Sequence, residues 1–125
     1  MRYYGATKKL GITLGARDLE YHGFSDSDYA GSVEDRKSTS SYIFFLAGGP
    51  ISWKTICQRS IALSSTKAEY YALTEAAKEA MWHQMLLDEL KYTSTDIHLV
   101  TLHGDNTRAL DLAKNPKYYS RVKYI

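Results

Sequence analysis

Three carboxylates that are far apart in the sequence have side chains suited to metal chemistry. They are Asp26 in GFSDSDYAG, Glu69 in LSSTKAEYYAL and Asp105 in HLVTLHGDNTRAL. Acidic groups brought together repel one another and raise one another's pKa values. Divalent cations remove that penalty and take oxygen ligands of this kind. The three acids therefore predict a site for a pair of divalent cations, an arrangement suited to phosphodiester chemistry.

The strands that must position these acids can be read from the alternation of polar and apolar residues. Residues 19–25 alternate as in a strand, and residues 38–48 and 51–56 predict a β-hairpin with its turn at 48–50. Residues 97–103 are apolar on both faces, which predicts a central, covered strand. Because a helix separates it from the hairpin, this strand should run parallel to the first.

A long helix between the hairpin and the last strand should carry Glu69. Ser64, Ser65 and Thr66 offer N-caps, and no Gly or Pro follows before Lys91. Apolar side chains recur there at three- and four-residue steps: Leu73, Ala76, Ala77, Ala80, Met81, Trp82, Met85 and Leu86. Glu69 continues this stripe, so we expect it to face the sheet.

Each acid also has a purely structural interpretation. Asp26 lies in a Ser/Asp/Gly-rich turn, where Asp often hydrogen-bonds its own backbone. Glu69 stands three residues after Thr66, which is the spacing of a capping box. Asp105 precedes a short helix predicted over residues 106–114 and is suited to be its N-cap. The combination of all three is harder to explain by caps and turns alone.

Composition narrows the class of protein. A chain of 125 residues is long enough for one domain, and a net charge of +2 says little about partners. The single Cys57 excludes a disulfide framework and a cysteine zinc cluster. No segment resembles a signal peptide or a membrane span, so we expect an intracellular soluble protein without a membrane partner.

A family resemblance is carried by three segments: GFSDSDYAGSVEDRKSTSSYIFFLAGGPISWKT, QRSIALSSTKAEYYALTEAAKEAMW and LHGDNTRALDLAKNP. They resemble the ribonuclease H domain at the C-terminal end of copia-type (Pseudoviridae) retrotransposon polyproteins. The likeness implies a ribonuclease H-like domain over residues 19–125 that lacks its last element. Residues 1–18, of which 11–14 look strand-like, are similar to the tail of the connector from the reverse transcriptase.

The resemblance implies an α/β (α+β) fold with a mixed sheet: a three-stranded antiparallel meander, a long helix, a parallel strand and a further helix. It also implies hydrolysis of the RNA strand of an RNA–DNA hybrid. Asp26, Glu69 and Asp105 match the family's catalytic acids, which bind two Mg²⁺ ions, with Mn²⁺ as a substitute. In that scheme Asp26 bridges both ions, Glu69 lies near the leaving group and Asp105 lies near the nucleophile.

Several positions depart from the family pattern. Lys67 stands where relatives carry a Glu, and Thr107 stands where they commonly carry Gln. Tyr29, Ser41 and Gly104 replace Trp, Gly and Cys. The chain stops at SRVKYI, before the segment in which relatives carry a fourth acid. We therefore expect weak binding of the nucleophile-side ion and reduced or absent nuclease activity.

Candidate contacts to the nucleic acid lie beside the acids and at the C-terminus. The first set, expected to bind phosphates and 2′-hydroxyls, is Arg36, Lys37, Ser38, Thr39, Lys54 and Asn106. A basic run follows at Lys114, Lys117, Arg121 and Lys123. For each basic residue the alternative is a solvated surface charge.

The expected partners are an RNA–DNA hybrid, the reverse transcriptase domain of the same polyprotein, and a second copy of the chain through the truncated end. The expected location is cytoplasmic, in the retrotransposon particle, or nuclear. One alternative function is a catalytically impaired or domesticated module that binds nucleic acid without cutting it. Another is a scaffold whose acids serve only as caps and turns.

Overall fold

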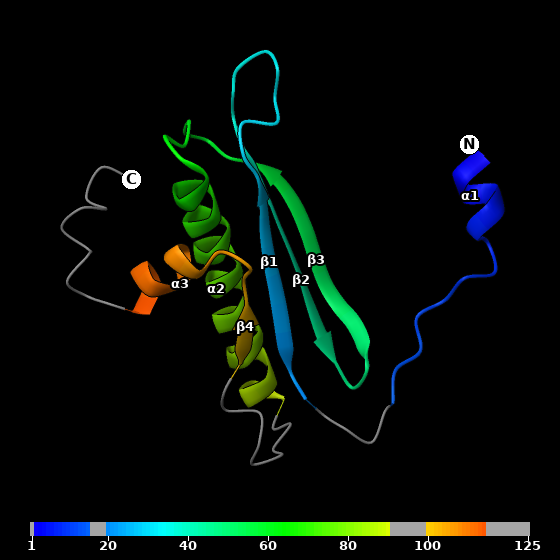
Figure 1. The fold of residues 1–125 in the computed structure, drawn as a ribbon. Helices are drawn as coiled ribbons and strands as arrows, with labels where there is room; N and C mark the ends of the chain where they lie inside the picture. The colour runs from blue at the N-terminus through cyan, green and yellow to red at the C-terminus, as the bar shows by residue number, and fades with distance from the viewer. Residues whose placement is uncertain (1, 16–19, 91–99, 115–125) are drawn as a thin grey trace.

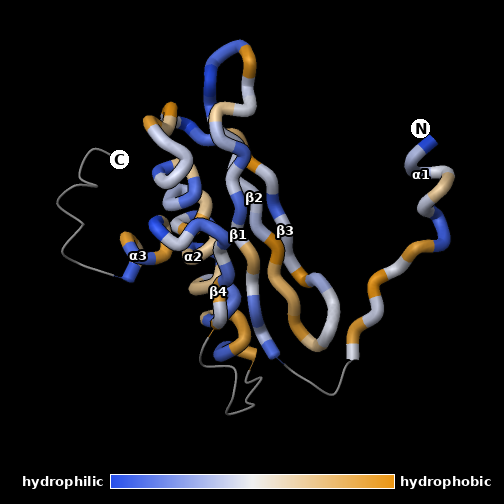
Figure 2. The backbone as a smooth tube through the Cα atoms, viewed as in Figure 1, coloured by the Kyte–Doolittle hydropathy of each residue, from blue (hydrophilic) through white to orange (hydrophobic). Residues whose placement is uncertain are grey.

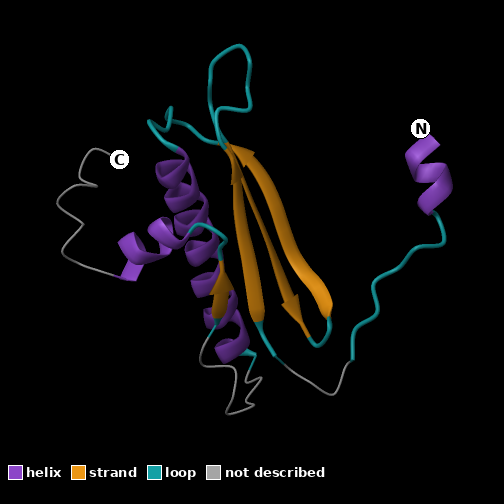
Figure 3. Ribbon diagram, viewed as in Figure 1, coloured by secondary structure: helices purple, strands orange, loops and turns teal. Residues whose placement is uncertain are grey.

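The computed structural model describes residues 2–15, 20–90 and 100–114. In chain order the elements are α1 (Arg2–Thr7), β1 (His22–Asp28), β2 (Thr39–Leu46), β3 (Gly49–Cys57), α2 (Ser65–Glu89), β4 (Thr101–His103) and α3 (Thr107–Lys114). The described strands form one sheet in the order β3-β2-β1-β4, with β1 antiparallel to β2 and parallel to β4. Helix α2 packs along one face of this sheet (Figures 1 and 3). The predicted α/β fold with a mixed sheet is confirmed, and it is consistent with a ribonuclease H-like arrangement.

The hairpin between β2 and β3 closes one residue earlier than its glycines predict. Leu46 pairs with Gly49, so the two turn residues are Ala47 and Gly48. Both have positive φ, 52° and 79°, as a type I′ turn requires in order to match the twist of the strands. The turn predicted at 48–50 was therefore misplaced, because Gly49 already belongs to β3.

The segment before the sheet is not a strand. The predicted strand at 11–14 has no strand pairing; instead the backbone N–H of Gly15 donates to the Ala47 carbonyl (3.2 Å) beside the hairpin turn. Gly49 contacts the same segment, since a Cβ there would lie 2.8 Å from the Thr13 carbonyl oxygen. Helix α1 has no buried residue and lies apart from the sheet (Figure 1).

Helix α2 faces the sheet through a row of small residues, and the predicted stripe was only partly right. The buried positions are Ala68, Ala72, Ala76, Ala80 and His83. Of the predicted stripe, Ala76 and Ala80 are in this row, whereas Ala77, Met81, Trp82, Met85 and Leu86 are exposed. Alanine has no side chain beyond Cβ, so a row of alanines lets the helix backbone approach the sheet closely. Figure 2 shows hydrophobic residues at the C-terminal end of α2, where the larger ones are exposed.

The strand predicted to be central lies at an edge of the described sheet. Strand β4 spans only Thr101–His103, and residues 97–99 lie outside the described part of the chain. Among the described strands β4 pairs with β1 alone, and both Thr101 and His103 are exposed. The parallel pairing with β1 is confirmed, from His22↔Thr101 to Phe24↔His103. Within the described residues no helix is both long and apolar enough to cross a bilayer.

The core between α2 and the sheet is built around Phe44, which is 0% exposed. Its ring packs against Tyr21, Tyr42 and His83, at centroid distances of 5.2–5.7 Å. Gly23 lies opposite Phe44 in the β1–β2 register, and a Cβ there would overlap the Phe44 ring. The absence of a side chain at this position of β1 therefore makes room for the largest fully buried group of the core.

A buried hydrogen bond between Tyr21 and His83, with Glu79 nearby, links this core to α2. The Tyr21 hydroxyl lies 2.7 Å from His83 Nδ1, and His83 Nε2 lies 3.6 Å from Glu79 Oε1. Burial raises the pKa of Tyr21, so its hydroxyl stays protonated and donates to Nδ1. Burial also lowers the pKa of His83, an effect that the negative charge of Glu79 opposes in part. His83 is therefore held as the neutral imidazole.

We expect this neutral His83 to make the fold less stable in mild acid. Its pKa in the folded state lies below its unfolded value of about 6.5, so the unfolded chain binds the proton more readily. The contribution of His83 to stability is complete above the unfolded pKa and is lost as pH falls below it. Urea unfolding at pH 7 and pH 5 measures this loss in the wild type. A His83→Gln variant should lose less stability between the two values, and an equal loss in both proteins would contradict the assignment.

Candidate metal centre

Three elements bring the predicted acids together. Asp26 lies near the C-terminal end of β1, Glu69 in the second turn of α2, and Asp105 between β4 and α3. One carboxylate oxygen from each lies within 4.8 Å of the others. Because β1 and β4 are parallel, their C-terminal ends lie at the same edge of the sheet, and the N-terminal end of α2 lies beside it (Figure 1). The predicted convergence of these three side chains is therefore observed.

The turn and capping-box interpretations do not hold for the first two acids. Asp26 is a strand residue paired with Ser41, not a turn residue. The N-cap of α2 is Ser64, whose Oγ accepts from the Lys67 backbone N–H (3.2 Å). Glu69 lies five residues beyond that cap, too far for capping-box geometry. Asp26 is therefore not a turn residue, although one of its oxygens accepts from the next backbone N–H, and Glu69 does not cap α2.

Asp105 does not cap the helix that follows it. The side chain that does so is Asn106, whose Oδ1 accepts from the Ala109 backbone N–H (3.0 Å). Ala109 is buried against the rest of the fold, so this cap fixes the start of α3. Asp105 is left exposed at the acidic cluster.

The electrostatics of the cluster favour a bound cation. Burial raises the pKa of Glu69, and the negative charges of Asp105 and Asp26 raise it further. The polar groups of Ser27 beside it act in the opposite direction. A cation shared by the three carboxylates would remove both the burial penalty and the mutual repulsion. The donor set consists of carboxylate oxygens from half-buried and exposed side chains, and it fits a hard divalent ion such as Mg²⁺.

One polar group at the site was not predicted. The Ser27 backbone N–H donates to Asp26 Oδ1 (2.8 Å), which restricts the orientation of that carboxylate. Its place directly after Asp26 in the SDSD run is the signal that could have identified it.

The basic candidates near the first acid lie on the loop between β1 and β2. Arg36 is exposed with a φ of 56°, and Lys37 forms an ion pair with Asp35 (3.3 Å). Ser38 is fully buried, and its Oγ accepts from the Ala30 backbone N–H (3.0 Å). This loop extends past the end of the sheet (Figure 1). Arg36 is thus open to solvent and Lys37 is paired with Asp35, whereas Ser38 holds the loop together.

The remaining candidates are spread over the fold. Thr39 is half-buried at the start of β2, opposite Asp28. Lys54 lies in the middle of β3, at the far edge of the sheet from β4. Lys114 ends α3, and the other members of the basic C-terminal run lie outside the described residues.

Comparison with known proteins shows that the chain is similar in sequence to parts of transposon polyproteins. It is 38% identical, over its whole length, to part of the retrovirus-related Pol polyprotein from transposon TNT 1-94 of Nicotiana tabacum. It is also 37% identical over its whole length to part of the Pol polyprotein from transposon RE2 of Arabidopsis thaliana. This chain is homologous to a segment of transposon Pol polyproteins.

This chain spans only 9% of the length of the first polyprotein and 8% of the length of the second. A third relative is secreted RxLR effector protein 161 of Plasmopara viticola, which is 48% identical over 83 residues, or 66% of this chain and 58% of that protein. No family model matches the chain.

Proposed function

We propose that this chain is the ribonuclease H domain of a copia-type retrotransposon polyprotein. Its activity would be metal-dependent cleavage of the RNA strand of an RNA–DNA hybrid. The observation that carries the proposal is the convergence of Asp26, Glu69 and Asp105 within 4.8 Å, from three elements of a mixed α/β fold. Homology to Pol polyproteins supports it, because reverse transcription creates such hybrids.

The acids would act by holding cations against the scissile phosphate. Asp26, Glu69 and Asp105 are the residues that would bind Mg²⁺, and the chemistry supplied by bound Mg²⁺ is charge neutralisation and activation of water. Asp26 and Asp105 are exposed, so a phosphate can approach them from solvent. Glu69 is half-buried beside Ser27, and this burial would limit the orientations open to its carboxylate.

Substrate binding would come from the side of the acidic cluster. Arg36 and Lys37 lie on the loop that extends past the same end of the sheet as Asp26, where they can meet backbone phosphates. The minor groove of a hybrid presents 2′-hydroxyls on its RNA strand, and these distinguish RNA from DNA. A cluster of acids flanked by cations is thus suited to a strand that crosses the end of the sheet.

The proposal is tested with a hybrid whose RNA strand carries a fluorescent label. We expect detectable cleavage of that strand in Mg²⁺ or Mn²⁺, at the reduced rate that the sequence predicts, none in EDTA, and none of a matched DNA duplex. Calorimetric titration with Mn²⁺ should show binding that an Asp26→Asn/Asp105→Asn variant lacks. Hybrid binding that is unchanged by EDTA and without cleavage would instead identify a nucleic-acid-binding module. Absence of metal binding and of hybrid binding would contradict both.

A further inference from the structure

A second site lies on the opposite side of α2 from the acidic cluster. A pocket of about 460 Å³ separates β3 from this helix, a volume within the usual range of about 300–1,000 Å³ for small-ligand sites. Its helix side is lined by Tyr71, Glu75 and Lys78. At 100° per residue these positions point away from Glu69, and β3 is the sheet edge farthest from β4.

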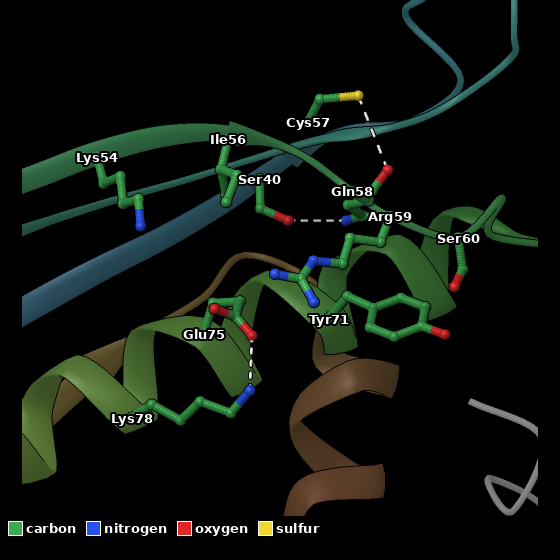
Figure 4. Close-up of a pocket in the computed structure, with 10 residues that line it drawn as sticks. All are labelled: Ser40, Lys54, Ile56, Cys57, Gln58, Arg59, Ser60, Tyr71, Glu75 and Lys78. Atoms are coloured by element: carbon green, nitrogen blue, oxygen red, sulfur yellow. Dashed lines mark hydrogen bonds and ion pairs between the residues drawn. The ribbon is translucent and has the colours of Figure 1, made fainter.

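The pocket has an excess of positive charge. Lys54, Arg59 and Lys78 line it together with one carboxylate, Glu75. Lys78 Nζ and Glu75 Oε1 pair at 2.7 Å and neutralise each other. Among the described residues Lys54 and Arg59 have no ion-pair partner, and both are exposed. Figure 4 shows their side chains extending from the strand side of the pocket toward α2. The side chains of Lys54 and Arg59 are therefore available to bind an anion.

A buried acceptor in the same pocket lacks a donor. Gln58 is only 8% exposed, and its Nε2 donates to Ser40 Oγ (2.8 Å) and to the Ala68 carbonyl (2.9 Å). Because a carbonyl can only accept, these contacts fix which end of the amide is the nitrogen. Gln58 Oε1 is then the free end, and it has no hydrogen-bond partner among the described residues. A buried unsatisfied acceptor is costly. Because the atom is closed to solvent, a ligand hydroxyl or amino group would satisfy it only after the Gln58 side chain shifts toward the pocket.

The pocket combines three features: a pair of cations for an anion, an acceptor without a donor, and an aromatic ring. Together they match the chemistry of a nucleotide. We propose that this pocket binds a nucleotide, with its phosphate on Lys54 and Arg59 and a sugar or base donor on Gln58 Oε1. The Tyr71 ring, which also lines the pocket, offers a surface on which a base can stack. The phosphate belongs either to a free nucleotide or to a nucleic-acid strand. The site does not depend on the acidic cluster or on catalysis there.

The test is a nuclear magnetic resonance titration of the isotope-labelled chain with adenosine 5′-monophosphate, and separately with inorganic phosphate. The nucleotide should shift the Gln58 side-chain amide resonance and bind more tightly than inorganic phosphate. A Lys54→Gln/Arg59→Gln variant should bind the nucleotide at least about tenfold more weakly, because it loses two charge-assisted contacts.

A six-residue oligodeoxynucleotide distinguishes a free nucleotide from a nucleic-acid strand as the source of the phosphate. Tighter binding than that of the mononucleotide, with the same Gln58 shift, indicates a strand, and equal binding indicates a free nucleotide.

The matched control is Arg2→Gln/Lys9→Gln, which removes the same charge from the N-terminal segment outside the pocket. It should bind the nucleotide like the wild type. Equal weakening in both double variants, or no Gln58 shift with millimolar nucleotide, overturns the proposal. The Lys54→Gln/Arg59→Gln variant should still bind Mn²⁺ at the acidic cluster. Failure of the pocket is thereby distinguished from failure of the nuclease proposal.

Discussion

Replacing Glu69 with glutamine is expected to abolish metal-dependent cleavage while leaving the fold at least as stable. Glutamine keeps the shape of the side chain but removes one of the three carboxylates that meet within 4.8 Å. Loss of a direct ligand should weaken metal binding by more than the 10–100-fold typical of an outer-shell partner, so we expect cleavage to fall at least about 100-fold. Single-turnover cleavage of the labelled hybrid and Mn²⁺ titration measure the two effects.

Stability is the second readout for Glu69. Burial and the charges of Asp105 and Asp26 raise its pKa, so at neutral pH the ionised side chain is unfavourable without a cation. In EDTA the Glu69→Gln variant should therefore melt at the wild-type temperature or above it, and it should lose the stabilisation by Mn²⁺ that the wild type shows. Glu89→Gln makes the same change at an exposed position near the end of α2. It should change neither the cleavage rate nor the stabilisation by Mn²⁺. A comparable loss in the Glu89→Gln variant would contradict the assignment of Glu69 as a metal ligand.

The Phe44→Ala substitution is expected to cost about 3–5 kcal/mol of unfolding free energy. Phe44 is 0% exposed and contacts three rings, those of Tyr21, Tyr42 and His83. Truncation leaves a cavity that a row of alanines on α2 cannot fill. Because whole domains are stable by only about 5–15 kcal/mol, much of the chain could be unfolded at 37 °C. Urea denaturation followed by circular dichroism measures the change.

Phe24→Ala is the matched control, because it makes the same truncation on the opposite face of the sheet. Phe24 pairs with Ile43 in β2, one residue away from Phe44, and it is 44% exposed. The closest ring to it among the described residues is that of His103, which stacks on it at 4.9 Å between centroids. We expect a loss of about 1 kcal/mol or less. Equal losses at the two positions would mean that the face under α2 is not the core.

From the first strand of the sheet onward, the sequence predicted the order of elements and the three acids, since both depend on local signals. Ser64 caps α2 through a backbone N–H three residues away, and adjacent Gly and Pro residues predicted the hairpin, although its turn lies one residue earlier. The predictions were wrong where burial of a side chain depends on how closely another element packs against it. Met81, Trp82 and Met85 are hydrophobic and occur at helical spacing, yet the face of α2 that packs against β1 and β2 buries only alanines and His83.

Two further features could not be predicted from neighbouring residues: which side chain caps α3, and whether Gln58 is buried. Asp105 and Asn106 are both good N-caps, and the structure uses Asn106 for α3, which leaves Asp105 for the acidic cluster. Gln58 looks like an ordinary polar residue after a strand, but packing against Ala68 and Ser40 buries it. Its unsatisfied oxygen cannot be inferred from a list of residues.

By itself, then, the sequence determined which residues could do chemistry and which elements carry them, because residue type, caps and turns act over a few positions. Only the tertiary structure decided that the carboxylates of Asp26, Glu69 and Asp105 lie within one ion's reach, and that Lys54 and Arg59 border a separate pocket. Those facts depend on the parallel pairing of β1 with β4 and on the close packing of α2 against the sheet. Both are long-range contacts whose geometry is set by the volumes of side chains distant in sequence.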